Sequence, residues 1–273
     1  MDTLEAIVQH DWTTLQANRN KGIVTVQLAR TNERNALDPL LMSELTAIAS
    51  RLRRCPELRA VILCGADDFF SAGADLKNSR QRATANLTLL ELRALVAAGP
   101  DLCQAWQDIE AVTIVAIEGF CIGGACALAV ACDFRIMAEG SYLRLPEVPL
   151  GMNMSWRTLP RLEALIGPSR AKQFVLFGEP ATAEVCANWG LADELCRKGD
   201  ALRIATKWAQ KVASLPPIPV RMTKEAINAA TQVTADAVSF MDRDQFLLSS
   251  RSSDYAEGVA AFLEKRTPIF RGD

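Results

Sequence analysis

The sequence predicts an α/β fold in which layers of parallel sheet are covered by helices. Residues 22–29 (GIVTVQLA) alternate in the manner of a strand, and residues 59–64 (RAVILC) form another strand-like run. A third run, VTIVAI at Val112–Ile117, is β-branched and apolar throughout, as expected for a strand buried on both faces. Loops and helical stretches separate these runs, and this repetition favours parallel sheet layers over a helical bundle.

Length and charge narrow the class of protein. The 273 residues are 49% hydrophobic, which is enough for one substantial core, with or without a small appendage. The net charge of -2 offers no basic excess, so we expect no nucleic-acid partner. No signal peptide and no apolar span of membrane length is visible, so we expect a soluble protein with no membrane partner.

The eight cysteines are predicted to be core thiols. They lie mostly inside apolar runs, form no CxxC pair and accompany a single histidine, His10. This pattern favours reduced thiols in a cytosolic protein over a disulfide framework or a zinc site. We therefore expect a cytoplasmic location and no bound metal.

The N-terminal part is predicted to contain an edge strand and a capped helix. Trp12 and Leu15 are compatible with the start of an edge strand, which would precede the strand at 22–29. Asp38 is a favoured N-cap and Pro39 suits the first helical turn. We expect a helix from there to about residue 54, followed by the strand at 59–64.

Helices dominate the predicted connections further along the chain. Residues 87–110 have helical apolar spacing, and Gly99-Pro100 is expected to bend or split that helix. Beyond Gly151, helices are expected at 156–166, 169–177, 182–189, 200–215, 220–230, 236–249 and 253–265, with a short apolar run at 191–196.

The central stretch, residues 111–151, combines a strand, a glycine turn, a buried helix and a second strand. The turn holds Gly123 and Gly124, and a run of small residues continues to Cys132 before the strand at Phe134–Ala138. The first N–H groups of a helix lack internal partners and lie at the positive end of its dipole. This turn can therefore bind an anion or a developing oxyanion.

A carboxylate follows this stretch in apolar surroundings. Glu147 comes after Pro146 and is flanked by Leu145, Val148, Pro149 and Leu150. Desolvation there raises the pKa of a carboxyl and favours proton transfer.

A second glycine loop lies at residues 69–77 (FFSAGADLK). Gly73 permits backbone torsions that other residues resist, and Asp75 favours the start of a following helix. We therefore expect the Ala74 N–H to point into a cleft.

Together these motifs resemble the crotonase family, the enoyl-CoA hydratases and isomerases. The resemblance extends from about Gly22 to FLEKR near the C-terminus, nearly the whole chain. It implies a crotonase-like spiral of repeated strand-strand-helix units over residues 1–199 and a helical trimerisation region over residues 200–273. It also implies an acyl-CoA thioester as substrate, with coenzyme A as part of that substrate and no further cofactor, and a homotrimer or a dimer of trimers.

The resemblance assigns roles to individual residues. The N–H groups of Ala74 and Gly124 would hold the thioester oxygen, and Glu147 would be the acid/base. Substrate contacts, largely through backbone atoms, are implied for Asn35, Ala36, Leu37, Ala72, Asp75 and Leu76. Phe262 and Lys265 match positions that reach the CoA of a neighbouring subunit.

The segment after Gly151 departs from this resemblance. Met152, Met154 and Trp156 stand where many hydratases of the family have small, glycine-rich residues. We expect a reshaped acyl pocket lined by the two methionines, although core packing explains such residues equally well.

Position 127 carries the departure that bears on the reaction. The resemblance implies a glutamate three residues after the oxyanion glycine in two-carboxylate hydratases, and here that residue is Ala127. Three residues are about one helical turn, so Ala127 would face the same pocket as Gly124. Shifting a double bond needs one base, whereas adding water needs a proton donor and a polarised water. The leading hypothesis is therefore an enoyl-CoA isomerase with Glu147 as its single acid/base. The alternatives are a hydratase that uses Glu147 alone or with another carboxylate, and a catalytically degenerate CoA-thioester binder.

Overall fold

A computed structural model describes residues 3–75, 87–232 and 235–273, and its largest sheet confirms the predicted α/β class. This sheet has the order β1-β2-β3-β4-β6-β9. Its strands are β1 (Leu15–Asn20), β2 (Ile23–Leu28), β3 (Ala60–Cys64), β4 (Val112–Ile117), β6 (Phe134–Ala138) and β9 (Glu194–Cys196). Only the edge pair β1–β2 is antiparallel. β4 and β6 match the predicted strands residue for residue.

A second sheet, which the sequence did not predict, brings two loops together. It consists of β5 (Phe120–Ile122), β7 (Tyr142–Arg144) and β8 (Ala181–Thr182). β5 and β7 are parallel and end in register, with Ile122 opposite Arg144. The loops that leave these two strands therefore start side by side at one edge of the sheet.

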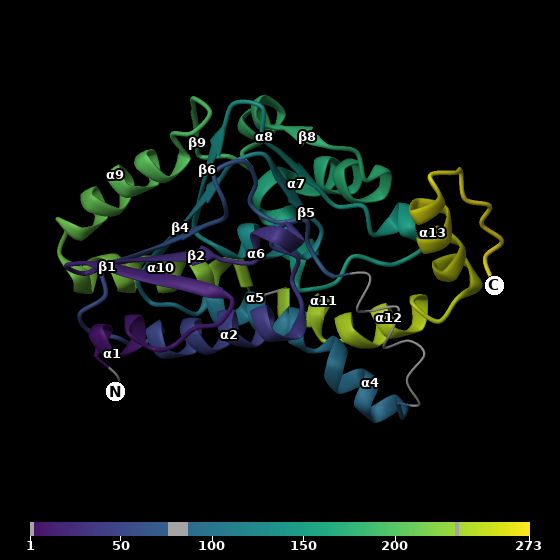
Figure 1. Cartoon of the computed structure of the whole chain (residues 1–273), viewed down its shortest axis with the longest axis horizontal. Helices are drawn as coiled ribbons and strands as arrows, with labels where there is room; N and C mark the ends of the chain where they lie inside the picture. Colours follow the sequence, from purple (N-terminus) through teal and green to yellow (C-terminus); the bar gives the residue numbers. More distant parts are fainter. Residues whose placement is uncertain (1–2, 76–86, 233–234) are drawn as a thin grey trace.

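Helices cover both faces of the large sheet (Figure 1). The helical elements are α1 (Leu4–Val8), η1 (Thr31–Glu33), α2 (Pro39–Leu52), α4 (Leu89–Val96), α5 (Ala98–Gln107), α6 (Gly124–Ala131), η2 (Val148–Leu150), α7 (Thr158–Phe177), α8 (Ala183–Trp189), α9 (Ala201–Ala213), α10 (Pro217–Gln232), α11 (Ala235–Ser239), α12 (Asp242–Ser249) and α13 (Ser253–Glu264). Alternate residues of β3 separate the two layers: Val61 and Leu63 face the cluster that includes α2, α5 and α6, whereas Ile62 packs with Ala205 of α9. Across the described ranges, none of these helices combines the length and apolar character needed to cross a membrane.

Local signals explain where the predicted helices begin. The Asp38 carboxylate accepts a hydrogen bond from the Leu41 N–H at 2.8 Å, which confirms the predicted N-cap of α2. Thr182 caps α8 in the same way, through the Val185 N–H. Gly167 is non-helical within α7 and marks the predicted boundary between two helical segments.

Two predicted helix boundaries were wrong. The helix expected at 87–110 is split as predicted, but the break lies at Ala97 rather than at Gly99-Pro100, because Pro100 falls in the first turn of α5, where its missing N–H costs no helical hydrogen bond. The helix expected at 236–249 is divided into α11 and α12. The division lies next to Asp242, whose carboxylate turns inward to bind the segment before α7.

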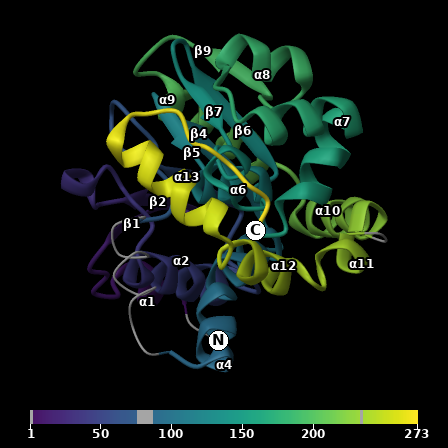
Figure 2. The same cartoon turned by 90° about the vertical axis from the view of Figure 1, so that its right-hand side faces the viewer.

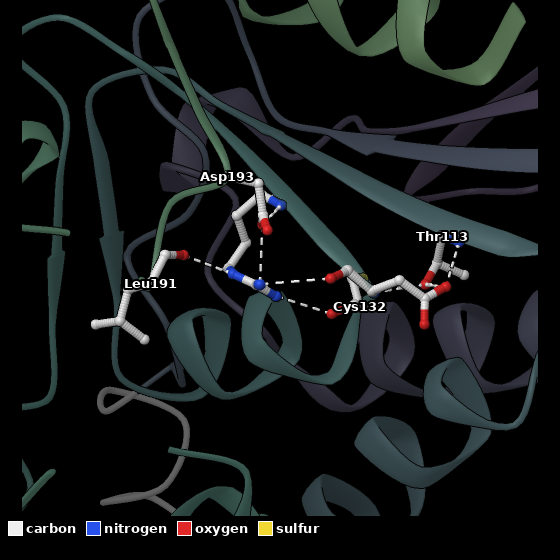
Figure 3. A network of polar contacts seen from close by, with 6 residues as sticks. Thr113, Cys132, Leu191 and Asp193 are labelled. Atoms are coloured by element: carbon white, nitrogen blue, oxygen red, sulfur yellow. Dashed lines mark hydrogen bonds and ion pairs between the residues drawn. The ribbon is translucent and has the colours of Figure 1, made fainter. Parts of the chain in front are cut away.

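Buried polar contacts fix the far end of α6. The guanidinium of Arg135, on β6, donates to the carbonyl oxygens of Leu191 at 2.5 Å and Cys132 at 2.9 Å, and to the Asp193 carboxylate at 2.9 Å. Figure 3 shows these groups converging. Because Cys132 is the C-cap of α6, this network holds the helix against β6 and the turn before β9.

The C-terminal helix α13 packs on the segment that carries Glu147. A Cβ on Gly258 of α13 would lie 2.5 Å from the Leu150 carbonyl oxygen in η2, so the two backbones are in close contact. Figure 1 places α13 at the end of the molecule opposite α9, and Figure 2 views that end.

All eight cysteines are buried and unbridged, as predicted for core thiols. Burial raises the pKa of the Cys103 thiol to about 12, so it stays protonated at neutral pH.

Candidate active site

The first wall of the candidate site is the loop that contains Ala74. Leu37 forms a parallel bridge with Ala74: its N–H donates to the Gly73 carbonyl at 2.8 Å, and its carbonyl accepts from the Asp75 N–H at 3.2 Å. Both hydrogen bonds go to the neighbours of Ala74. The Ala74 N–H therefore faces away from Leu37.

Buried polar side chains hold this loop in place. The Ser71 hydroxyl donates to the Asn35 carbonyl at 2.7 Å and accepts from the Gly73 N–H at 3.1 Å. The Asn35 side-chain amide donates to the Phe70 carbonyl at 3.0 Å. Sequence reasoning missed Ser71, because a serine in such a loop has no local feature that indicates burial.

The second wall is the glycine turn before α6, and it touches the first. A Cβ on Gly73 would lie 2.3 Å from the Ile122 carbonyl oxygen, so only glycine allows this approach. The Ile122 N–H also donates to the Ser71 carbonyl at 3.1 Å. The two predicted oxyanion donors thus lie on loops that are joined by a hydrogen bond and by direct backbone contact.

Gly123 and Gly124 form the start of α6. Gly123 has φ 58° and ψ -125°, a conformation suited to glycine, and Gly124 is the first helical residue. The Gly124 N–H has no acceptor within the helix because it precedes the first complete turn. The Gly123 N–H donates to the Arg144 carbonyl at 2.8 Å, which ties this turn to the loop that holds Glu147.

The Glu147 carboxylate lies against the glycine turn. Its Oε1 atom is 3.0 Å from the position that a Cβ on Gly123 would occupy. Its Oε2 atom is buried and has no hydrogen-bond partner among the residues that the structure describes, although the residue as a whole is half-buried. Desolvation raises the pKa of Glu147 to about 7, and the nearby positive charge of Arg144 opposes this rise.

These features together support proton transfer next to a developing negative charge. A carboxyl with a pKa near 7 is partly ionised at neutral pH and can both accept and donate a proton. A helix-start N–H and an outward-facing loop N–H are the type of donors that stabilise an oxyanion. The predicted rise in the pKa of Glu147 is confirmed, and its cause is the desolvation expected from the apolar neighbours.

One bulky side chain, that of Trp156, borders the glycine turn. Ala127 is fully buried on α6, Met154 is 2% exposed and packs in the main core, and Met152 is 7% exposed. Trp156 is half-buried, and its ring lies against Gly124. Of the bulky residues after Gly151, Trp156 therefore contacts the predicted oxyanion donor.

The other predicted substrate contacts differ in exposure. Asn35 and Leu37 are buried, Ala36, Ala72 and Asp75 are half-buried, Ala74 is exposed, and Phe262 and Lys265 are exposed at the end of α13. Leu76 lies outside the described residues, as does the helix expected after Asp75.

Two polar residues of the central stretch, Arg144 and Glu118, have structural partners. Arg144 Nε donates to the Gly178 carbonyl at 2.7 Å, which fixes its charge beside the Glu147 loop. Glu118 accepts hydrogen bonds from the Gly199 and Ala201 N–H groups and thereby caps the start of α9.

Comparisons with known proteins identify the family of this chain. A family model described as enoyl-CoA hydratase/isomerase matches residues 18–273. The chain is 32% identical over 260 residues to a probable mitochondrial enoyl-CoA hydratase of Dictyostelium discoideum, covering 94% of this chain and 90% of that one. It is 30% identical to the 2,3-dehydroadipyl-CoA hydratase of Escherichia coli, covering 94% and 98%.

Solved structures show the same fold. An enoyl-CoA hydratase from Bacillus anthracis superposes with a TM-score of 0.75 at 32% identity, covering 96% of this chain and 100% of that one. An enoyl-CoA hydratase/isomerase from Xanthobacter autotrophicus gives 0.84 at 26% identity, covering 93% and 94%. The resemblance drawn from the motifs is thus confirmed, and the chain belongs to the enoyl-CoA hydratase/isomerase family of enzymes.

Proposed function

We propose that this enzyme shifts the double bond of an enoyl-CoA thioester, with Glu147 as its single acid/base. The Glu147 carboxylate removes a proton from C2 of a 3-enoyl-CoA, and the electron pair moves into the thioester carbonyl to give an enolate. The N–H groups of Ala74 and Gly124 donate to that enolate oxygen. Glu147 then returns the proton at C4, so that the double bond lies between C2 and C3 and no atom is gained or lost.

The observation that carries this proposal is the Glu147 carboxyl, with its pKa of about 7, beside the glycine turn. One carboxyl of this kind suffices to move one proton between two carbons. The position one helical turn beyond Gly124 is Ala127, which is buried and carries no titratable group. The second carboxylate that would help to polarise a water is therefore missing from that position.

Hydration of a 2-enoyl-CoA is the second candidate. Its support comes from the relatives, which are named as hydratases and match over more than nine-tenths of this chain at 30–32% identity. A hydratase with this site would need Glu147 both to polarise the water and to protonate C2, or it would need a carboxylate from elsewhere.

The proposal extends to CoA binding and assembly. The backbone of the loops around Leu37 and Ala72 would hold the CoA portion, since these loops border Ala74. Phe262 and Lys265, exposed on α13, would contact the CoA bound to a neighbouring subunit in a homotrimer or a dimer of trimers.

A substrate panel tests the reaction class. Purified protein is incubated with 2-enoyl-, 3-enoyl- and 3-hydroxyacyl-CoA thioesters of several chain lengths, and products are separated by chromatography. The proposal requires rapid conversion of 3-enoyl- to 2-enoyl-CoA without formation of 3-hydroxyacyl-CoA. Fast hydration would favour the second candidate, and binding without turnover would mark a degenerate thioester-binding protein.

A further inference from the structure

The indole of Trp156 is wedged between two glycines on different helices. A Cβ on Gly99 of α5 would lie 2.1 Å from Trp156 Cε2, and a Cβ on Gly124 of α6 would lie 2.5 Å from Trp156 Cη2. Real Cβ atoms do not approach this closely, so the ring occupies space that side chains on either helix would need. The indole thus spans the gap between the first turns of α5 and α6.

The backbone around Trp156 is held in an uncommon conformation. Trp156 and Arg157 are consecutive residues with φ of 64° and 56°, the left-handed region that bulky residues rarely adopt. The buried Asp242 carboxylate on α12 accepts from the Ser155 hydroxyl at 2.9 Å and from the Arg157 N–H at 3.0 Å. Arg157 also pairs with Asp236 on α11. The C-terminal helices therefore fix the position of the indole.

The two adjacent glycines of the turn place the indole relative to the carboxylate. The Glu147 Oε1 atom lies 3.0 Å from the position that a Cβ on Gly123 would occupy, and the Trp156 ring lies against the corresponding position on Gly124. Consecutive Cα atoms are about 3.8 Å apart, so the carboxylate and the indole border the same few ångströms of backbone. An acyl group whose carbonyl oxygen is held by the Gly124 N–H would therefore begin next to this ring.

We propose that Trp156 closes the acyl pocket beyond the reacting carbons and restricts this enzyme to short-chain acyl-CoA thioesters. This inference rests on the proposed function, because it takes the Gly124 N–H as the thioester-oxygen donor. Asp242 is a positioning residue for the indole in this arrangement.

The test is calorimetric binding of saturated acyl-CoA thioesters, from butyryl to decanoyl, which cannot be isomerised or hydrated. A well-accommodated methylene contributes about fourfold to affinity. In the wild type, lengthening from butyryl to octanoyl should bring no such gain, because the added methylenes meet the indole. Trp156→Ala should bind octanoyl-CoA at least about tenfold more tightly than the wild type, with butyryl-CoA within about threefold.

Matched variants separate this effect from general loss of packing. Trp156→Phe keeps a ring and the local backbone, and should give an intermediate preference if the alanine variant does not fold. Trp189→Ala removes another half-buried indole, on α8, which packs on Phe174 of α7 outside the site, and should leave the wild-type preference unchanged.

The outcomes distinguish the role of Trp156 from the proposed isomerase activity. An octanoyl-CoA affinity that is the same in the wild type and both Trp156 variants overturns the inference, as does a wild type that gains affinity steadily with chain length. The expected binding shift without turnover of any enoyl-CoA would refute the proposed function and leave the assignment of Trp156 intact. Failure to bind any acyl-CoA overturns both.

Discussion

Replacing Glu147 with glutamine removes the proposed base while keeping the size of the side chain and most of its hydrogen bonding. If Glu147 transfers the proton in the chemical step, kcat should fall by about 10²–10⁴-fold with little change in the affinity for a CoA ester. The same substitution has a second, opposite consequence for stability, which follows from the burial of the carboxyl.

The stability effect has a definite sign and pH window. The pKa of Glu147 rises from its ordinary value of 4.5 to about 7 in the folded protein. Between these two pH values the folded state keeps a proton that the unfolded chain has lost, so the free energy of unfolding decreases as pH rises through this window. The full rise corresponds to about 3 kcal/mol, which is the upper limit of the stabilisation that Glu147→Gln should bring above pH 7.

The assay combines kinetics and calorimetry. The initial rate of 3-enoyl-CoA isomerisation is measured from pH 5 to pH 9, and kcat/KM should rise with a midpoint near pH 7, because only the ionised carboxylate accepts a proton. Scanning calorimetry should give the glutamine variant a higher Tm than the wild type at pH 8 and a smaller difference at pH 5. Glu139→Gln, at an exposed glutamate after β6, should change neither the rate nor the Tm.

Two results would refute this reasoning. A glutamine variant with nearly wild-type kcat would show that the chemistry lies on other residues. A rate midpoint near pH 4.5, together with a lower Tm of the variant at pH 8, would show that the Glu147 carboxyl is not desolvated in solution.

Three further variants test the other parts of the site. Ala127→Glu places a carboxylate one helical turn beyond Gly124, where Glu147 repels it, so one of the two carboxyls should have an unusually high pKa. Some hydration of a short 2-enoyl-CoA should then appear. An unchanged product ratio would mean that the missing carboxylate at position 127 is not what prevents hydration. Gly124→Ala places a methyl group 2.5 Å from the Trp156 ring, so the turn must move; kcat should fall by about 10²–10³-fold, and full activity would remove Gly124 from the oxyanion site. The double variant Phe262→Ser with Lys265→Ala should weaken CoA binding and reduce the oligomer mass measured by light scattering, and because both side chains are exposed it should leave the Tm unchanged. Unchanged CoA affinity and unchanged mass would reject the proposed contact between subunits.

Strong local signals made much of the fold predictable. A continuous β-branched run predicted β4, and the Asp38-Pro39 pair predicted the start of α2, because both signals depend only on neighbouring residues. The strands β5, β7 and β8 were missed, because strands of two or three residues are too short to show an alternating pattern. Their pairing depends on partners that lie far apart in the sequence.

The candidate site likewise has parts that the sequence predicted and parts that it did not. The motifs around Ala74, Gly124 and Glu147 were recognisable from the sequence, and the apolar neighbours of Glu147 predicted the direction of its pKa. The anchoring of the Trp156 segment was not predictable, because the Arg157 N–H and the Asp242 carboxylate are 85 residues apart and neither has a distinctive sequence context. Ser71 was missed for a similar reason, since its burial depends on Asn35 in another loop.

The wedge of Trp156 between two helices also constrains how this sequence can change. Gly99 has no role in the proposed chemistry, yet a methyl group there would lie 2.1 Å from the indole. Gly99→Ala should therefore unfold the protein at a lower temperature in the wild-type background and be close to neutral once Trp156 is alanine. The order of substitutions then matters: a lineage that acquires a larger residue on α5 must first lose the tryptophan. Among homologues, the residues at positions 99 and 156 should vary together, so that only one of the two positions carries a large side chain.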